Sequence, residues 1–225
     1  MSTGQAGSWQ CENRRWFQHS ESRRTILSDS AIFEALDDGR LVITPEPQPR
    51  RPSAEAPLVP FDRTSVNLRL GETLRIPRPN LAIAIDLSSG TAGPTLHALY
   101  DSRAIPDEGL VLDPNRFILG MTLESIRLPL PDALPPEVAG KGCLAARVEG
   151  KSSLARFGLL IHFTAPTIHA GFEGNITLEI MNLGPAPIRL QRGMPICQLI
   201  LEPVQGVPLG SGGQFSGQRD PAGRR

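Results

Sequence analysis

The amino-acid sequence predicts a mainly β fold with a short N-terminal helix. Three observations support this: no helical periodicity is sustained over a long stretch, many short β-branched runs stand between turn signals, and Gly and Pro number 22 each. With 225 residues, the chain has room for one substantial domain and short appendages. We assign residues 25–203 to that domain, residues 1–24 to a disordered leader and residues 204–225 to a flexible C-terminal tail.

The first element expected after the leader is a short helix. Ser28 offers an N-cap, Ile32 and Leu36 follow at helical spacing, and Gly39 stands where the helix should end. Residues 41–43 are then expected to form the first strand.

The rest of the domain is expected to consist of short strands separated by loops. Proline-rich segments at 45–60 and 129–136 predict loops, and residues 91–108 a mobile excursion. Residues 137–149 are expected to form a short helix or an irregular connection, because Gly140 and Gly142 argue against one long helix. Strands are expected at residues 65–70, 81–87, 110–112, 116–123, 125–128, 159–163, 175–181, 188–190 and 196–201.

Charge and cysteine content exclude several classes of protein. Lys plus Arg and Asp plus Glu are both 23, so no global basic field exists to attract a nucleic acid polymer. Cys11, Cys143 and Cys197 are far apart, which argues against a disulfide framework and a zinc ribbon. No apolar run approaches the ~18 residues of a membrane span. The leader lacks the apolar core of a secretory signal, so we expect a cytoplasmic protein.

A group of cations and hydroxyls at Lys151, Ser152, Ser153 and Arg156 suits an oligophosphate, because Lys and Arg make charge-assisted hydrogen bonds to phosphate oxygens. It is not a P-loop, since Ala145 stands where that motif needs Gly. On spacing alone, a solvated basic turn fits the residues equally well.

Glu179 lies in an expected strand with alternating faces. Ile176, Leu178 and Ile180 share one face, whereas Thr177 and Glu179 share the other. A carboxylate in such a strand belongs either to an exposed face or to a cleft. In a cleft, burial would raise its pKa and let it move a proton near neutral pH.

Zinc-dependent deamination is not predicted. The zinc deaminases need H-x-E followed by P-C-x-x-C, and although His19 and Glu21 match the first half, no C-x-x-C occurs in the chain. His162 and His169 also lack a partner at metal-ligand spacing, so each is expected to be structural when considered alone.

Together these segments resemble the dCTP deaminase family of the trimeric dUTPase-like superfamily. The resemblance is strongest over residues 148–159, Val-Glu-Gly-Lys-Ser-Ser-Leu-Ala-Arg-Phe-Gly-Leu, and continues through Gly171-Phe172-Glu173-Gly174-Asn175-Ile176-Thr177-Leu178-Glu179. It covers roughly residues 25–221. Further matching segments are residues 26–29, 34–41, 65–71, 164–168, 187–188, 193–194, 196–199 and 213–219.

The resemblance implies a distorted β-barrel or jelly-roll that forms a homotrimer with active sites at the subunit interfaces. Its implied reaction is zinc-independent hydrolysis of dCTP to dUTP and ammonia, which feeds dUMP and dTTP synthesis. Glu179 would be the general base and acid, taking a proton from the water that attacks C4 of cytosine and delivering protons toward N3 and the departing ammonia.

The resemblance also implies the residues that hold the nucleotide. Lys151, Ser152, Ser153 and Arg156 would bind the triphosphate from a neighbouring subunit, with Mg²⁺ bridging phosphate oxygens. A hairpin at residues 164–169 would recognise base and deoxyribose. The remaining substrate-binding residues implied are Ala165, Thr167 and His169 of that hairpin, Thr177, Leu178, Gln198, and Gln214 and Gln218 of a tail that closes over the phosphates.

The chain departs from the family pattern in places that bear on specificity. His169 stands where the family has the Asp that meets the sugar, Gln214 where it has a phosphate-binding Lys, and Phe215 where it has a Tyr. Losing one phosphate cation costs about 1.5–3 kcal/mol of binding. Two alternatives follow from the resemblance: a dUTPase or bifunctional dCTP deaminase and dUTP diphosphatase, and a nucleotide-binding homologue without catalysis.

Overall fold

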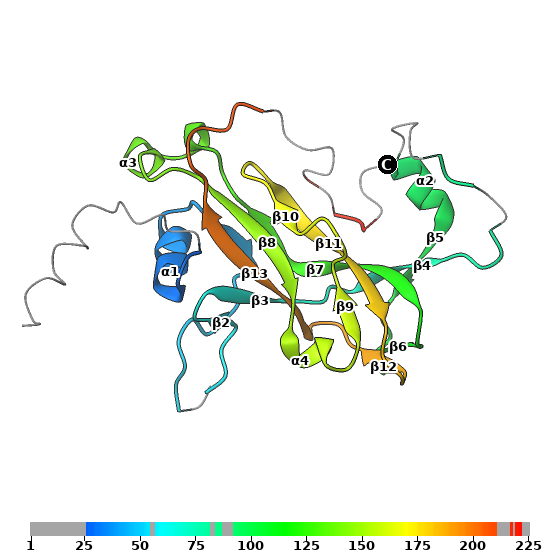
Figure 1. The fold of residues 1–225 in the computed structure, drawn as a ribbon. Coiled ribbons are helices and arrows are strands. Elements are labelled where there is room, and N and C mark those ends of the chain that lie inside the picture. Colours follow the sequence, from blue (N-terminus) through cyan, green and yellow to red (C-terminus); the bar gives the residue numbers. More distant parts are fainter. Residues whose placement is uncertain are drawn as a thin grey trace, which may run out of the picture.

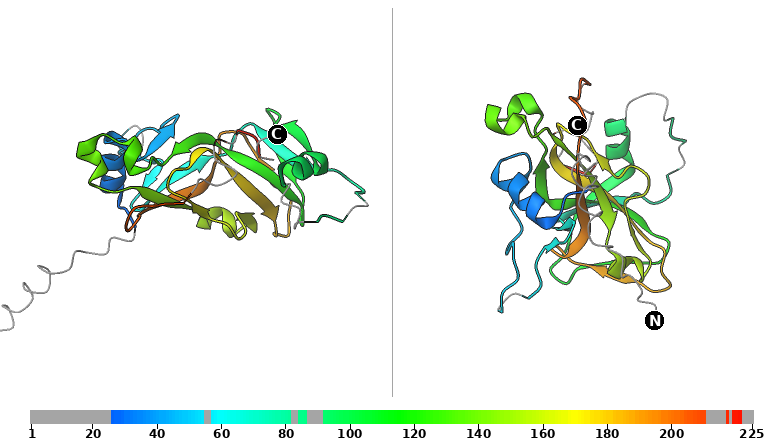
Figure 2. Two further views of the ribbon diagram at one scale, coloured as in Figure 1. Left: turned by 90° about the horizontal axis from the view of Figure 1, so that it is seen from above. Right: turned by 60° about the vertical axis from the view of Figure 1, so that its left-hand side comes forward.

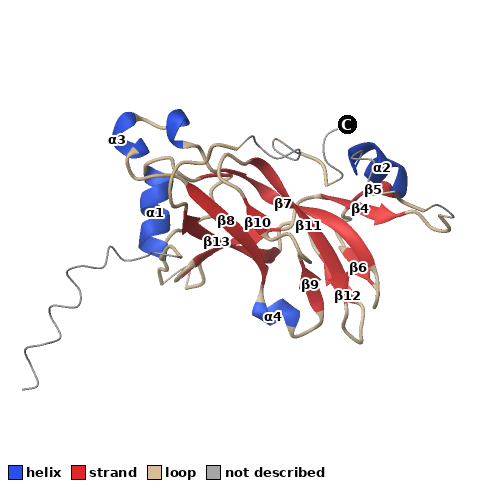
Figure 3. Cartoon of the chain, turned by 45° about the horizontal axis from the view of Figure 1, so that its top comes forward, coloured by secondary structure: helices blue, strands red, loops and turns tan. Residues whose placement is uncertain are grey.

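The computed structural model confirms a mainly β protein with a few short helices (Figure 3). The expected leader, residues 1–24, lies outside the described residues, and so do Gln214, Phe215 and Gln218 of the tail. The described residues are 26–54, 57–81, 84–86, 92–210, 217 and 219–221.

The first sheet holds six antiparallel strands and carries Glu179. Its main order is β5-β4-β7-β11-β9, and β1 pairs with the far end of the long strand β7. Its strands are β1 (Val42–Thr44), β4 (Thr73–Pro77), β5 (Tyr100–Ala104), β7 (Phe117–Arg127), β9 (Leu159–Ile161) and β11 (Glu173–Asn182). The pairing of β11 with β9 decides which residues lie beside Glu179.

The second sheet holds five antiparallel strands in the order β10-β8-β13-β3-β2. These are β2 (Phe61–Asp62), β3 (Ser65–Arg69), β8 (Leu144–Gly150), β10 (Thr167–Ile168) and β13 (Pro195–Pro203). A separate two-stranded sheet pairs β6 (Leu110–Leu112) with β12 (Ile188–Leu190). Neither large sheet closes on itself among the described strands, so the arrangement is a jelly-roll-like stack of sheets and not a closed barrel.

One hydrophobic core joins the two large sheets. Alternate residues of β11 and β13 point into it, because successive side chains of a strand face opposite sides. Leu178 of β11 and Leu199 of β13 are both 0% exposed. The same alternation leaves the intervening polar residues half-exposed on the opposite faces, where a ligand can reach them.

The helices are short and lie at the ends of the sheets (Figures 1 and 2). α1 (Asp29–Asp37) and α3 (Pro136–Ala139) lie at one end and α2 (Ala92–Leu99) at the other, with α4 (Ser152–Ala155) after β8 and a 3₁₀ turn at Pro131–Ala133. α1 confirms the predicted helix, since Ser28 Oγ accepts from Ala31 N at 3.5 Å and Gly39 takes φ +79°. No helix in the described part of the chain is long and apolar enough to cross a membrane.

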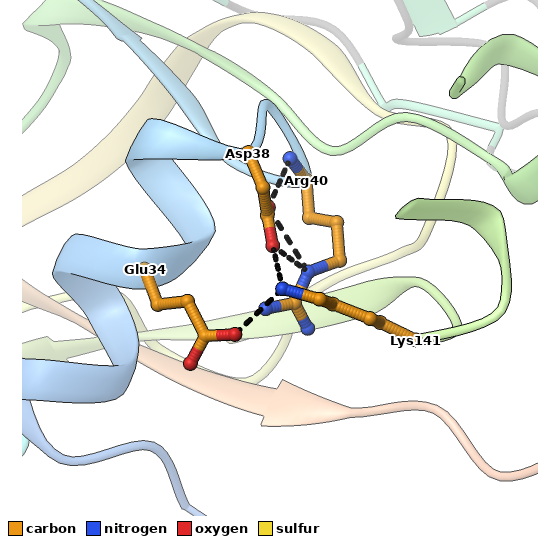
Figure 4. A network of polar contacts seen from close by, with 4 residues as sticks. All are labelled: Glu34, Asp38, Arg40 and Lys141. Atoms are coloured by element: carbon orange, nitrogen blue, oxygen red, sulfur yellow. Dashed lines mark hydrogen bonds and ion pairs between the residues drawn. The ribbon is translucent and has the colours of Figure 1, made fainter. Parts of the chain in front are cut away.

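A charged network ties α1 to the segment that leads into β8 (Figure 4). Lys141 Nζ lies 2.6 Å from Glu34 Oε1 and 3.0 Å from Asp38 Oδ2, and Arg40 Nε lies 3.0 Å from the same Asp38 oxygen. Arg40 is buried, with 9% of its surface exposed, so the Asp38 carboxylate compensates its charge. Lys141 therefore fixes the loop before β8 on the first helix.

Three expectations for secondary structure were wrong. Residues 73–77 form β4 although no strand was expected there, whereas residue 81 and residues 84–86 of the expected strand 81–87 are not in a strand. Residues 92–104 form α2 and β5 where a mobile excursion was expected. In the segment 137–149, expected to be a short helix or an irregular connection, the short helix is α3, but residues 144–149 belong to strand β8. β4, β5 and β8 all gain their backbone hydrogen bonds from strands distant in sequence, which local patterns do not reveal.

Candidate active site

Glu179 occupies the half-exposed face of β11, as the alternation predicts. Ile176 and Ile180 on the other face are 2% and 0% exposed, whereas 30% of the Glu179 side chain is exposed. Leu178, which the resemblance places at the substrate, has its side chain in the core. That side chain is therefore turned away from the face that carries Glu179.

The chain segment that follows β9 folds over Glu179. Because β9 pairs with β11, His162 N donates to the Glu179 main-chain oxygen at 2.9 Å, and Phe163 N donates to Glu179 Oε2 at 3.2 Å. Nδ1 of His162 lies 3.0 Å from the same Oε2. His162 adopts φ +67°, a left-handed conformation uncommon for a residue with a side chain, and this turn brings both contacts to one carboxylate oxygen.

These contacts correct the expectation for the ionisation of Glu179. Burial by itself raises the pKa of Glu179, but the His162 contact and the Phe163 N–H together lower it by more than burial raises it. The pKa of Glu179 therefore lies below the ordinary value of 4.5. The carboxyl is therefore ionised at neutral pH. Both side-chain contacts hold the oxygen Oε2, and a carboxylate held by one oxygen is suited to accept a proton on the other.

Three buried polar atoms on residues close to Glu179 make no hydrogen bond among the described residues. They are Oγ1 of Thr177, which shares the Glu179 face of β11, and both ring nitrogens of His162, whose Nδ1 contacts Oε2 at 3.0 Å without hydrogen-bond geometry. Buried polar groups are nearly always satisfied, so atoms of this kind indicate that water or a ligand completes the site. This observation supports the expected involvement of Thr177.

The Lys151–Arg156 motif lies at the end of β8. The strand ends at Gly150, and Lys151 precedes α4, whose helical turn presents Ser152, Ser153 and Arg156 to solvent. Lys151 is partly buried, and its Nζ donates to Oδ1 of Asn67. Among the described residues, no hydrogen bond or ion pair joins this motif to Glu179.

The hairpin residues and Gln198 lie on neighbouring strands. Ala165, Thr167 and His169 are all exposed, and Thr167 in β10 pairs with Arg147 of β8. Gln198 of β13 stands half-buried between its register partners on β3 and β8. Gln214 and Gln218 lie outside the described residues.

Sequence reasoning missed two residues of the site. His162 was expected to be structural, and Asn67 was not singled out. Asn67 faces Gln198 across the register of β3 and β13, and the alternation of the strand at 65–70 was the available signal. No comparable signal exists for His162, because its approach to Glu179 depends on the register of β9 with β11.

The described residues contain no group of three or more His, Cys, Asp or Glu side chains that could hold a metal ion. A Mg²⁺ ion that accompanies a phosphate chain commonly takes its ligands from phosphate oxygens and water. Lys151 and Arg156 are suited to share the remaining negative charge of such a phosphate chain.

Comparisons with known proteins agree on one family. A family model described as "dCTP deaminase-like" matches residues 26–204. A protein of Rhodospirillum rubrum named dCTP deaminase is 36% identical over 179 residues, which cover 78% of this chain and 81% of the relative. A protein of Methanobrevibacter smithii named "dCTP deaminase, dUMP-forming" is 34% identical over 180 residues, 79% of each chain.

A solved structure confirms the fold class. The 2′-deoxycytidine 5′-triphosphate deaminase of Agrobacterium tumefaciens matches with a TM-score of 0.52 and 20% identity, over 81% of this chain. The match spans 49% of the Agrobacterium chain, about half its length.

Proposed function

The chain belongs to the dCTP deaminase-like family, and on this premise we propose that it hydrolyses dCTP to dUTP and ammonia with Glu179 as general base and acid. The observation that carries the proposal is the ionised, half-buried Glu179 carboxylate beside His162 Nε2 and Thr177 Oγ1, two polar atoms without partners among the described residues. The predicted Lys151–Arg156 motif supplies the cations and hydroxyls for the triphosphate.

The proposed reaction begins at the Glu179 carboxylate. It takes a proton from water while the water oxygen bonds to C4 of cytosine, and the protonated carboxyl then delivers that proton to N3. The carboxylate next takes the proton of the new C4 hydroxyl and gives it to the amino nitrogen, so that C4=O forms, the C4–N4 bond breaks and ammonia leaves. The sum is dCTP plus water giving dUTP plus ammonia, so Glu179 is regenerated as a carboxylate.

His162 and Phe163 orient the carboxylate in this scheme. Both contact Oε2, which leaves Oε1 to handle the proton. A fixed carboxylate avoids reorganisation during the reaction, which is the advantage of a preorganised site.

The phosphate end is proposed to use Lys151, Ser152, Ser153 and Arg156. The Mg²⁺ ion, when bound, offsets phosphate charge. Among the described residues, no hydrogen bond or ion pair joins Glu179 to this motif within one chain, and we propose a homotrimer in which different subunits supply them. A free nucleotide substrate agrees with the proposed cytoplasmic location.

The deciding experiment measures ammonia release from dCTP in the presence of Mg²⁺. Glu179→Gln should lower kcat by about 10²–10⁴-fold, the usual contribution of a general acid–base group. Glu173→Gln is the matched control, because Glu173 lies on the same strand with an exposed side chain, and it should keep wild-type activity. Undiminished release by Glu179→Gln, or none by wild type, would disprove the assignment.

A second candidate function is conversion of dCTP to dUMP and pyrophosphate. Relatives named dUMP-forming match this chain as well as those named dCTP deaminase alone, at 34–37% identity. Analysis of the phosphorus-containing products by ³¹P NMR separates the two, since only the bifunctional enzyme forms pyrophosphate.

A further inference from the structure

The side chain of Lys151 reaches across a strand to its hydrogen-bond partner. Lys151 follows the last residue of β8, and its Nζ donates to Oδ1 of Asn67 on β3. Strand β13 lies between β8 and β3 (Figure 1), and its Gln198 is the register partner of Asn67. The Lys151 side chain therefore spans β13 on the face where Asn67 and Gln198 stand side by side.

Two contacts of opposite kind fix the Asn67 amide. Its Oδ1 accepts from the Lys151 ammonium group, and its Nδ2 donates to Oδ2 of Asp62 at 3.1 Å. An ammonium group can only donate and an ionised carboxylate can only accept, so one orientation of the amide satisfies both partners. An asparagine meets both demands, whereas an ionised aspartate at this position would direct a negatively charged oxygen at Asp62.

The strand that carries Asn67 is held from several sides. The Asn67 N–H donates to the main-chain oxygen of Pro60 at 2.7 Å, and β3 pairs with β2 on one edge and with β13 on the other. The backbone of Lys151, in contrast, is extended between β8 and the short helix α4, and a lysine side chain has many rotamers in isolation. A contact from a paired strand restricts those rotamers before a ligand binds, which lowers the entropic cost of binding.

The partner of Lys151 is uncharged, and this bears on anion binding. Among the residues that the structure describes, Lys151 forms no ion pair, and the Asp62 carboxylate lies on the far side of the Asn67 amide. A carboxylate in direct contact would offset the charge of the ammonium group, and a phosphate would then have to compete with it. The amide orients the ammonium group without offsetting its charge.

We propose that Asn67 is a positioning residue: its amide oxygen directs the Lys151 ammonium group toward nucleotide phosphate and leaves the positive charge to that anion. The inference rests on the proposed function, because it takes the Lys151–Arg156 motif to bind the triphosphate. It also gives a reason for an asparagine at this position, since the amide that holds Lys151 keeps the Asp62 carboxylate away from it.

Isothermal titration calorimetry with inorganic triphosphate and Mg²⁺ measures this role without any reaction. Asn67→Ala releases the Lys151 side chain and should raise Kd about tenfold, the usual effect of one lost hydrogen bond to a charged group. Asn67→Asp should raise Kd more than Asn67→Ala, because its carboxylate pairs with Lys151. Gln48→Ala is the matched control: it removes another amide that donates to a carboxylate, that of Glu46 in the loop after β1, and should leave Kd unchanged.

A double-mutant cycle separates positioning from a purely structural role. Lys151→Met keeps an unbranched stem but removes the ammonium group, so in this background Asn67→Ala should change Kd by less than about twofold.

The contact with Asp62 tests the orientation of the amide. Asp62→Ala should raise Kd about threefold, whereas Asp62→Asn keeps an oxygen for Asn67 Nδ2 and should stay close to wild type. Because Asp62 is exposed, these two variants should fold even if Asn67→Ala does not.

Steady-state kinetics extend the test to the substrate. Asn67→Ala should raise KM for dCTP about tenfold with kcat within about twofold, because the change weakens phosphate binding and leaves Glu179 and its partners intact. A loss confined to kcat would contradict the assignment.

Each contrary result overturns a defined part. An unchanged Kd in Asn67→Ala, or an equal rise with and without the Lys151 ammonium group, overturns the positioning role. A Kd for Asn67→Asp at or below that of wild type overturns the argument from charge. A wild-type protein that binds inorganic triphosphate but releases no ammonia from dCTP overturns the proposed function, whereas the calorimetric cycle then still decides the role of Asn67.

Discussion

Replacing Asn182 by Ala should destabilise the protein severely, because its side chain closes β11 onto two other segments. Asn182 is 0% exposed, and its Nδ2 donates to the main-chain oxygens of Leu112 and Ala186, each at 2.9 Å. Its Oδ1 accepts from Gly184 N, also at 2.9 Å. One side chain therefore holds the end of β11, strand β6 and the turn before β12 together.

The magnitude follows from these three bonds. Each contributes about 1 kcal/mol, and the Leu112 carbonyl and the Gly184 N–H left buried without partners add a further penalty, so the free energy of unfolding should fall by about 3–5 kcal/mol. Asn182→Asp should be nearly as harmful. It keeps the acceptor for Gly184 but turns a negatively charged oxygen toward two carbonyl oxygens.

Urea denaturation followed by far-UV circular dichroism measures this loss. Tryptophan fluorescence is not used, because Trp9 and Trp16, the two tryptophans, lie outside the described residues. Asn175→Ala provides the comparison within β11, because Asn175 is only half-buried and its Nδ2 hydrogen bonds are 3.0 and 3.3 Å long. This variant should lose about 1–2 kcal/mol of unfolding free energy. A loss below about 1 kcal/mol for Asn182→Ala would refute the reasoning.

Three further predictions concern backbone conformation, ionisation and thiol reactivity. Gly158→Ala should lower the free energy of unfolding by about 2–5 kcal/mol in urea denaturation, because Gly158 has φ +86° and an added Cβ would collide with the Gly184 backbone. Gly39→Ala is the control: its φ is +79°, but nothing lies within 4 Å of the added Cβ, so the loss should be about 1–2 kcal/mol. Equal losses would contradict the steric argument. The pKa of Glu179 is lowered in the folded state, so its ionised carboxylate stabilises the fold above pH 4.5, and this contribution is lost as the pH falls through the folded pKa. The stability of Glu179→Gln should therefore decline less than that of wild type below pH 4.5. Identical pH profiles of stability would count against this reasoning. Burial raises the pKa of the Cys197 thiol, so iodoacetamide at pH 8 should leave this thiol unlabelled in the native protein. Peptide mass spectrometry measures the labelling, and rapid labelling of the native protein would contradict the burial of Cys197.

Local patterns in the sequence determined the fold class, the first helix and the face of β11 that carries Glu179. Ser28 and Gly39 mark the helix ends through interactions within one turn, and the alternation at residues 176–180 needs only the pleat of one strand. The exposed Ser152, Ser153 and Arg156 were likewise predicted together, because they follow one another along the chain.

The tertiary structure decided the features that depend on strand pairing. Strands β4 and β8 escaped prediction because their hydrogen bonds come from segments far along the chain, and Arg75 meets Asp220 across 145 residues. The pKa of Glu179 differs from the sequence-based expectation for the same reason. Its sequence neighbours indicate only burial, which raises a carboxyl pKa, whereas the register of β9 with β11 brings His162 and Phe163 to Oε2 and lowers it.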